Sequence, residues 1–295
     1  MINQSAAVLE SGEHTTHADR LPESSVAREW RASLNLRFEP SASKTILRRS
    51  HRGPLMVQRP FYPEGETCHA YVLHPPAGIV GGDHLMVKAT CQSGARGLVT
   101  TPGAAKFYGS DGRLAQQEQH ISVGDSMLEW LPQETIFYNR CNAKQITRVN
   151  LSAESRFIGW EVNCFGRPAG DQLFESGRIS SRMEIYMEGT ALLLERLKVT
   201  GSADLEMNSG MRSASVNATM IAISPGLYAA ELLDRVRDTF SRKDLFSATL
   251  IDSLLVIRYL GHSAEEARYG FICVWHALRP TIIQRQVVVP RIWAT

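Results

Sequence analysis

The sequence lacks the short motifs that usually mark a nucleotide-binding or catalytic site. It contains no G-x-x-x-x-G-K-[ST] run, and its nearest candidate, Gly103-Ala104-Ala105-Lys106, has only part of a phosphate-binding loop. It also has no G-x-S-x-G nucleophile elbow and no H-E-x-x-H zinc helix. These absences argue against a nucleotide hydrolase, a serine hydrolase or a zinc peptidase built on those motifs.

Other absences bound the environment in which the chain works. Its five cysteines are scattered and form no C-x-x-C, which predicts a reducing, cytoplasmic location and no disulfide framework. No stretch approaches 18 apolar residues and no basic-then-apolar order opens the chain, so we expect neither a membrane span nor a signal peptide. Lys and Arg form no run, and the formal net charge is +2, so we expect no nucleic-acid partner.

The sequence does contain a long series of strand-like segments that begins at Trp30. Leu34, Leu36 and Phe38 alternate with polar residues, which is typical of a half-buried strand. Short runs of this kind, separated by Pro/Gly turns, continue with no amphipathic helix of useful length between them. This order argues against βαβ units and predicts a mainly β fold, with a stacked or antiparallel multi-strand β body. The expected strands lie near 34–38, 45–47, 55–58, 71–74, 85–91, 97–100, 114–123, 126–131, 134–138, 146–151 and 156–162.

The ends of the chain differ from this β body. Residues 1–28 are rich in Ser, Thr, Glu and Ala, which predicts a flexible N-terminal extension before a single unit at 29–295. Within that unit we expect the β body at about 29–225 and a helix-containing part at about 226–295. In the latter, Ser263 and Glu266 form a capping-box pattern. The helix that they open is expected to stop before Pro280.

The stretch from Cys68 to Asp83 has the most concentrated candidate chemistry. A short strand ends at Pro75-Pro76, which cannot donate ladder hydrogen bonds, and a Gly-rich turn then presents Asp83. Its carboxylate follows Cys68 and two imidazoles, so the turn is able to present ligands for a borderline metal ion such as Ni²⁺, Zn²⁺ or Cu²⁺. A tight turn in which Asp83 caps its own backbone explains the same residues. The two histidines are His69 and His74.

Carboxylates also recur inside apolar strands. Glu161 shares a strand face with Phe157, while Trp160 faces the other way. If both faces are covered, this carboxylate must be paired, hydrogen-bonded or protonated. A path lined by sparse carboxylates and hydroxyls suits a divalent cation that has to enter and leave. Glu129, by contrast, is equally explained by a solvated strand face. The other candidates for such a path are Asp83, Glu134, Thr100 and Thr101.

Several blocks, in order, resemble the urease accessory protein UreD family, called UreH in some organisms. They cover nearly the whole chain from about Trp30, and several ordered blocks are more specific than any one of them. The blocks are the runs at 52–65, 69–83, 100–108, 128–134, 157–161, 166–168 and 290–295, among them Thr100-Thr101-Pro102-Gly103-Ala104-Ala105-Lys106-Phe107-Tyr108.

The resemblance implies a mostly β fold with stacked sheets and a non-enzymatic role. Members of the family act as a scaffold and nickel-delivery chaperone for urease. They bind apo-urease and the helical protein UreF, which engages the GTPase UreG, and nickel is thought to cross their interior. For this chain we therefore expect no tightly bound cofactor and transient contact with nickel along Asp83, Glu134, Glu161, Thr100 and Thr101, with His69 and His74 as further candidates. We also expect the helical C-terminal part to contribute to the UreF surface.

Two other functions remain open at this stage. The first alternative is a purely structural adaptor that holds urease open without touching nickel. A β-rich hydrolase that uses Asp83 and Glu161 as an acid/base pair is the second alternative. Turnover by the isolated protein distinguishes the hydrolase, and substitution of the interior carboxylates distinguishes the adaptor.

Overall fold

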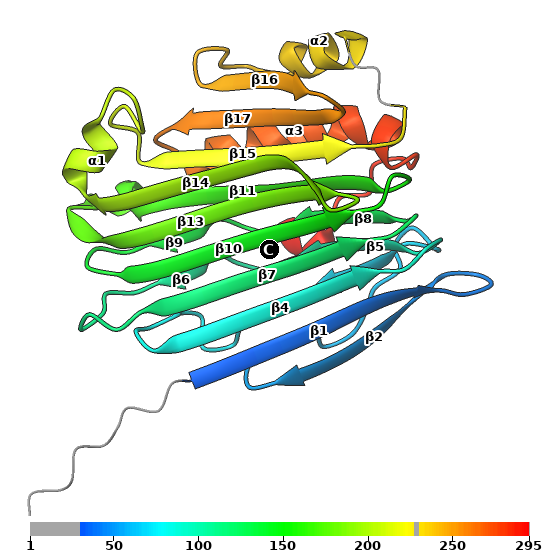
Figure 1. Cartoon of the computed structure of the whole chain (residues 1–295), viewed down its shortest axis with the longest axis horizontal. Helices are drawn as coiled ribbons and strands as arrows, with labels where there is room; N and C mark the ends of the chain where they lie inside the picture. Colours follow the sequence, from blue (N-terminus) through cyan, green and yellow to red (C-terminus); the bar gives the residue numbers. More distant parts are fainter. Residues whose placement is uncertain (1–29, 227–229, 295) are drawn as a thin grey trace, which may run out of the picture.

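Two stacked β-sheets form the body of the protein in the computed structural model, which describes residues 30–226 and 230–294 (Figure 1). The predicted extension at 1–28 lies outside the described residues. The seven-stranded sheet has the order β14-β13-β10-β7-β4-β1-β2. Its strands are β1 (Trp30–Pro40), β2 (Thr45–Arg52), β4 (Asp83–Cys91), β7 (Ala115–Val123), β10 (Asn142–Leu151), β13 (Ser176–Met187) and β14 (Thr190–Gly201).

The second, ten-stranded sheet has the main order β16-β17-β15-β11-β8-β5-β3. The short strand β12 pairs with β11, and β9 pairs with both β11 and β6. The strands are β3 (Cys68–Tyr71), β5 (Arg96–Thr100), β6 (Ala105–Phe107), β8 (Met127–Leu131), β9 (Thr135–Phe137), β11 (Arg156–Arg167), β12 (Gln172–Leu173), β15 (Val216–Ile223), β16 (Phe246–Ile251) and β17 (Leu254–Gly261).

The chain alternates between the sheets through its central part. β4, β7, β10 and β13 enter the seven-stranded sheet while β5, β8 and β11 enter the other, and neighbours within each series are parallel. Antiparallel pairs occur toward the edges, in β1–β2, β13–β14, β11–β15, β15–β17 and β16–β17. The prediction of a mainly β fold with stacked sheets and a small helical part is therefore confirmed, with parallel pairing in the centre. β16 and β17 show that the β body continues past residue 225.

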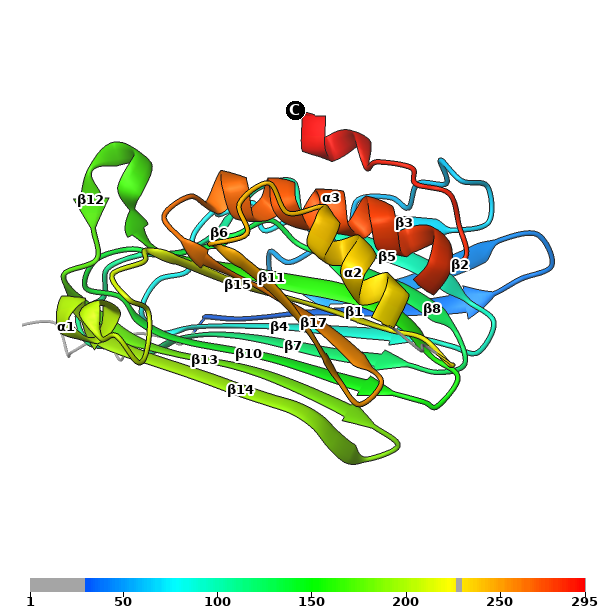
Figure 2. The same cartoon turned by 90° about the horizontal axis from the view of Figure 1, so that it is seen from above.

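Helices cover one side of this stack. The described helices are α1 (Ser202–Glu206), α2 (Ala230–Asp238) and α3 (Ala264–Ile282), with 3₁₀ turns at Pro168–Gly170 and Arg291–Ala294. Figure 2 shows α2 and α3 over the ten-stranded sheet, whereas the outer side of β10, β13 and β14 carries no drawn helix. One hydrophobic core lies between the sheets and a second joins the ten-stranded sheet to α2 and α3. β11 is consequently buried along both faces.

The N-terminus of α3 confirms Ser263 as the N-cap but not the reciprocal half of the predicted capping box. The Glu266 carboxylate accepts from the Tyr259 hydroxyl, and that hydroxyl, not Glu266, accepts from the Ser263 N–H. The Ser263 hydroxyl accepts a hydrogen bond from the Glu266 backbone N–H at 3.1 Å. The predicted stop before Pro280 is wrong, because α3 continues to Ile282. Pro280 lies in the last turn, where the loss of one backbone donor still leaves the bond from the Ile283 N–H to the Arg279 carbonyl. None of the described helices is long and apolar enough to cross a membrane.

Candidate functional site

A band of polar side chains lies between the two sheets, where a core of aliphatic residues would be expected. β7 directs Gln117 and Gln119 inward, and the neighbouring strand β10 places Gln145 and Thr147 opposite them in register. The inward residue that faces this band from β11 is Glu161. Strand periodicity explains the band, since Gln117 and Gln119 alternate with residues on the outer face.

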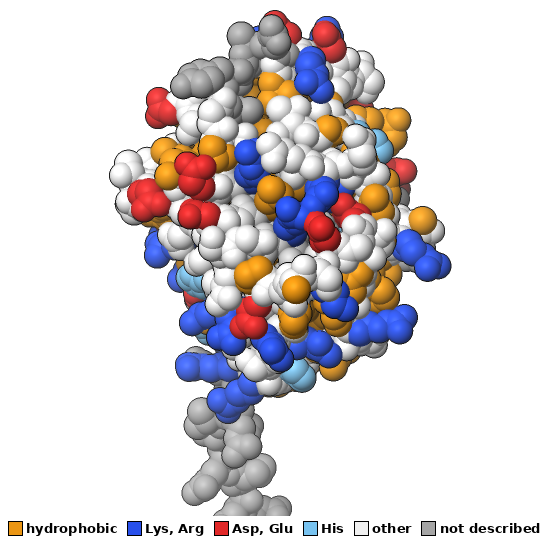
Figure 3. Space-filling model, turned by 90° about the vertical axis from the view of Figure 1, so that its right-hand side faces the viewer, with side chains coloured by type: hydrophobic (Ala, Val, Ile, Leu, Met, Phe, Trp, Pro, Cys, Tyr) orange, Lys and Arg blue, Asp and Glu red, His pale blue; other side chains and the backbone are white. Residues whose placement is uncertain are grey.

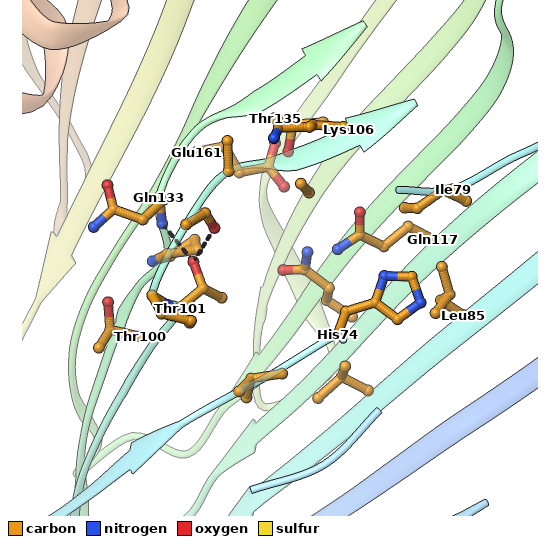
Figure 4. Close-up of a pocket in the computed structure, with 18 of the residues that line it drawn as sticks. His74, Ile79, Leu85, Thr100, Thr101, Lys106, Gln117, Gln133, Thr135 and Glu161 are labelled. Carbon is orange, nitrogen blue, oxygen red and sulfur yellow. Dashed lines mark hydrogen bonds between the residues drawn. The ribbon is translucent and has the colours of Figure 1, made fainter. Parts of the chain in front are cut away.

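Two cavities meet at Glu161. The first has a volume of about 260 Å³, and its lining includes Gln117, Gln145 and Glu161. The second has a volume of about 520 Å³ and is also lined by Glu161, together with Asn217 and Ser181. Figure 4 shows the Glu161 carboxylate and the Gln117 amide extending into the first cavity. Glu161 is thus common to both cavities.

Burial dominates the electrostatics of Glu161. Its side chain belongs to a residue that is 7% exposed, and burial raises the pKa of this carboxyl to about 7. Hydrogen bonding from Thr147 and Gln145 opposes that rise in pKa, and the charge of Glu195 adds to it. Glu161 therefore changes its charge near neutral pH, and its ionised form is favoured by any cation that reaches the cavity.

Unpartnered oxygen atoms line this region. Among the described residues, buried acceptors without a hydrogen-bond partner include Gln117 Oε1, Gln145 Oε1, Glu161 Oε1 and Asn217 Oδ1. The first three line the first cavity, and Glu161 and Asn217 line the second. A buried acceptor without a partner is unfavourable unless water or a cation satisfies it. The arrangement therefore offers successive single oxygen ligands to a hydrated divalent cation.

Basic side chains accompany these oxygens in both cavities. Lys106 lines the first cavity, where an ammonium offsets part of the charge of ionised Glu161. In the second, Arg258 Nε donates to Glu195 Oε1 at 3.0 Å, and the Thr219 hydroxyl donates to Glu195 Oε2 at 3.0 Å. The Glu195 carboxylate is therefore already neutralised by Arg258, which leaves Glu161 as the more available of these two carboxylates.

Four of the sequence-predicted residues lie on the first cavity: Glu161, His74, Thr100 and Thr101. Burial lowers the pKa of His74, opposed by the charge of Asp83, which favours the neutral imidazole needed for metal binding. The Thr101 hydroxyl donates to the Gly103 carbonyl and accepts from the Gln133 N–H, both at 3.0 Å (Figure 4). The Thr100 hydroxyl donates to the Leu131 carbonyl and accepts from Trp293 Nε1, so its hydrogen-bonding capacity is largely used.

The remaining predicted residues lie outside the linings of both cavities. Asp83 Oδ2 accepts from the Val80 N–H at 2.9 Å, which is the turn-capping alternative. Glu134 pairs with Arg268 at 3.3 Å. The described residues contain no group of three or more His, Cys, Asp or Glu side chains placed to hold a metal ion. The Cys68–Asp83 stretch therefore does not converge on a metal site, and Asp83 and Glu161 do not share a cavity lining as an acid/base pair would.

His69 belongs instead to a buried ionic cluster under α3. Its Nε2 lies 2.6 Å from Glu64 Oε1, and Arg279 from α3 bonds both Glu64, at 2.7 Å, and Glu129, at 3.0 Å. Trp275 Nε1 also donates to Glu129, at 2.6 Å. Glu129 is 1% exposed, so the solvated-face interpretation of this residue is wrong: α3 covers that face of the sheet. The cluster fixes α3 to the ten-stranded sheet.

The inward glutamines were missed by sequence reasoning. A signal for them exists in the run Gln116-Gln117-Glu118-Gln119-His120, in which the residues that point to either face of the strand are all polar. A strand in a stacked body has one face against the other sheet, so every second residue of this run has to be buried. The deciding information was the location of β7 in the middle of its sheet.

The fold and this interior define a class: a two-layer β protein with two oxygen-lined cavities that share one buried carboxylate, Glu161, and with a helix packed on its outer side. The chain belongs to the UreD urease accessory protein family, whose model matches residues 31–294. The resemblance found in the sequence is thereby confirmed.

Relatives agree along nearly the full length. The urease accessory protein UreD of Citrobacter koseri is 40% identical over 291 residues, covering 96% of this chain and 100% of that protein. The protein of the same name from Klebsiella aerogenes is 40% identical over 270 residues, covering 90% of this chain and 97% of the relative. That from Alcanivorax borkumensis is 40% identical over 275 residues, covering 90% and 92%.

Proposed function

We propose that this chain is a non-catalytic maturation factor for urease that binds apo-urease and the UreF–UreG GTPase complex and lets nickel pass through its interior to the urease active site. The observation that carries the nickel step is the position of Glu161, the buried carboxylate common to both cavities. Nickel is cargo in this function, and no tightly bound cofactor is required.

The chemistry of the interior favours passage over retention. A conducted ion needs ligands strong enough to replace part of its hydration shell and weak enough to release it. Glu161 supplies one charge, and the orphaned oxygens of Gln117, Gln145 and Asn217 supply neutral ligands on either side. Neutral His74 is a further ligand at the first cavity. The Lys106 and Arg258 cations weaken the binding of a divalent ion, which keeps any one site from becoming a trap.

The test is urease activation in a nickel-supplied host that lacks its own copy of this chain. Wild-type protein is co-expressed with apo-urease, UreF and UreG, and urea hydrolysis is compared with Glu161→Gln. We expect the variant to lower activation strongly while still co-purifying with UreF, because the substitution keeps the side-chain shape and removes the ionisable group. The matched control is Glu154→Gln, at an exposed carboxylate in the turn before β11, which should activate urease as the wild type does.

Three outcomes decide between the alternatives. Activation that does not depend on this chain at all refutes the maturation role. Wild-type activation by Glu161→Gln refutes the interior nickel path and favours the structural adaptor. Loss of activation by both variants points to a general failure to assemble. In that case neither variant should co-purify with UreF, which is measured separately.

A further inference from the structure

The outer face of the seven-stranded sheet collects basic side chains from strands that are far apart in the sequence. Strand register places outward residues in rows across the sheet. Three adjacent rows are Arg31-His84-Gln116-Lys144-Ser180-Lys198, Arg52-Ser33-Met86-Glu118-Ile146-Arg182-Arg196 and Ser50-Asn35-Lys88-His120-Arg148-Glu184-Leu194. We call these three rows the basic face.

The charge of the basic face is out of proportion to that of the whole chain. The rows contain eight Lys and Arg residues and two carboxylates, an excess of six positive charges on a chain whose formal net charge is +2. The remainder of the chain is therefore net acidic. No run of Lys and Arg in the sequence reveals this asymmetry, because each strand contributes only one or two of the charges. Figure 3 shows Lys and Arg side chains gathered toward its lower part, where Figure 1 draws β1 and β2, the two strands at one edge of this sheet.

Local ion pairs leave much of this charge uncompensated. Arg148 pairs with Glu184, with Arg148 Nε donating at 2.8 Å, and Glu118 lies between His84 and His120 at 3.1 Å from each ring. Among the described residues, no carboxylate lies within ion-pair distance of Lys88, Arg196 or Lys198, and all three are exposed. Like charges held at this density raise the local potential and attract an oppositely charged surface.

Nothing in the described part of the chain covers this face, in contrast to the opposite side of the molecule. α2 and α3 pack on the outer face of the ten-stranded sheet, and a hydrophobic core seals that contact (Figure 2). The seven-stranded sheet instead exposes its outer side chains, including Leu194, which is 53% exposed. A regular sheet face of this kind is a rigid platform on which a partner docks without rearrangement of this chain.

We propose that the basic face is the docking surface for a protein partner with an acidic surface. The inference rests on the proposed maturation role, which requires protein partners. A protein fits better than a nucleic acid, because Met86 and Ile146 place apolar groups at the centre of the middle row, flanking Glu118. Apolar groups among charged ones are typical of protein interfaces. Glu118 and Glu184 would repel a phosphate backbone, and the three rows contain no Phe, Tyr or Trp ring for base stacking.

The size of the basic face sets a further requirement. Six strand spacings of about 4.8 Å and two row spacings of about 7 Å give about 29 by 14 Å. That area is about half of the ~800 Å² that each partner contributes to a standard interface. The partner must therefore also contact adjoining surface, and the basic face acts mainly on the rate and orientation of association.

The test compares two triple charge reversals of the full chain. Lys88→Glu/Arg196→Glu/Lys198→Glu removes charge from the basic face, and Arg167→Glu/Arg212→Glu/Lys243→Glu makes the same change in net charge elsewhere. All six residues are exposed. Association with purified apo-urease, with purified UreF and with duplex DNA is followed by biolayer interferometry at low and high salt. Circular dichroism and thermal unfolding confirm that each variant is folded.

We expect the basic-face variant to associate at least tenfold more slowly with one of the two proteins at low salt, with the difference shrinking at high salt. The control variant should bind like the wild type. Equal association of both variants with both proteins overturns the proposal, and so does duplex DNA that binds as tightly as the protein partner. The two proposals fail in different ways. If the wild type activates urease but the basic-face variant binds normally, only the docking inference fails. If the wild type does not activate urease, the proposed function fails.

Discussion

Glu161 makes a quantitative prediction about stability that is independent of urease. Each pKa unit corresponds to about 1.4 kcal/mol of difference between the folded and unfolded states. The rise in the Glu161 pKa from 4.5 to about 7 therefore corresponds to about 3 kcal/mol. Because the folded-state pKa is raised, the folded protein binds the proton more tightly than the unfolded chain does. This contribution to stability is complete below pH 4.5 and is lost as the pH rises to 7.

The substitution Glu161→Gln removes that dependence, because the amide resembles the protonated acid and does not ionise. The variant should match the wild type near pH 4 and exceed its free energy of unfolding by about 3 kcal/mol at pH 8. Urea titrations of both proteins across this range measure the difference, with Glu154→Gln as the matched control. Parallel curves for wild type and Glu161→Gln would show that the carboxylate is well solvated in the folded protein, and would refute the argument from burial. The expected combination, higher stability with lower activation, is typical of a functional group kept at the expense of stability.

Two further substitutions test how the C-terminal region is attached. Arg279→Met should destabilise the protein by about 3–5 kcal/mol, because Glu64 and Glu129 would remain buried without their cation; a loss below about 1 kcal/mol in thermal or urea unfolding would contradict this. Trp293→Phe removes the indole N–H that donates to the Thr100 hydroxyl at 2.9 Å, together with part of the ring that packs against Trp160 and Trp275. It should cost at least about 1 kcal/mol in urea unfolding, whereas no change would mean that water replaces the bond and that the smaller ring packs as well.

The sequence was sufficient to predict most of the strands but not their pairing. The expected strand at 55–58 is wrong, because that segment forms only an isolated bridge between Met56 and Leu73. Period-two patterning located β1, and the Ser263–Glu266 pattern located the start of α3, because both are local signals. Parallel pairing in the centre of each sheet was not predictable, since a Gly/Pro turn that leads into the other sheet looks the same as a hairpin turn. For the strand that carries Glu161, the sequence said only what would follow if both faces were covered, and the structure shows that both faces of β11 are buried.

The candidate site was predictable only in part for the same reason. Glu161 stood out because a carboxylate in an apolar strand is unusual, and the structure places it on both cavities. Gln117 and Gln145 carry no charge and lie in polar strands, so their inward direction depended on register across β7 and β10. Asp83 and His69 were conspicuous in sequence, yet their side chains are satisfied by Val80 and Glu64. Local concentration of polar residues therefore indicated turns and ion pairs as readily as a site.

The buried cluster under α3 also has a consequence for synthesis on the ribosome. Glu64 and Glu129 are made long before Arg279, the cation that neutralises both in the folded protein. Until α3 emerges, the outer face of the ten-stranded sheet has to leave these carboxylates in water, and the apolar surface around them has no cover. The nascent chain is thus prevented from completing its fold early, and the second core forms only after translation has passed residue 279.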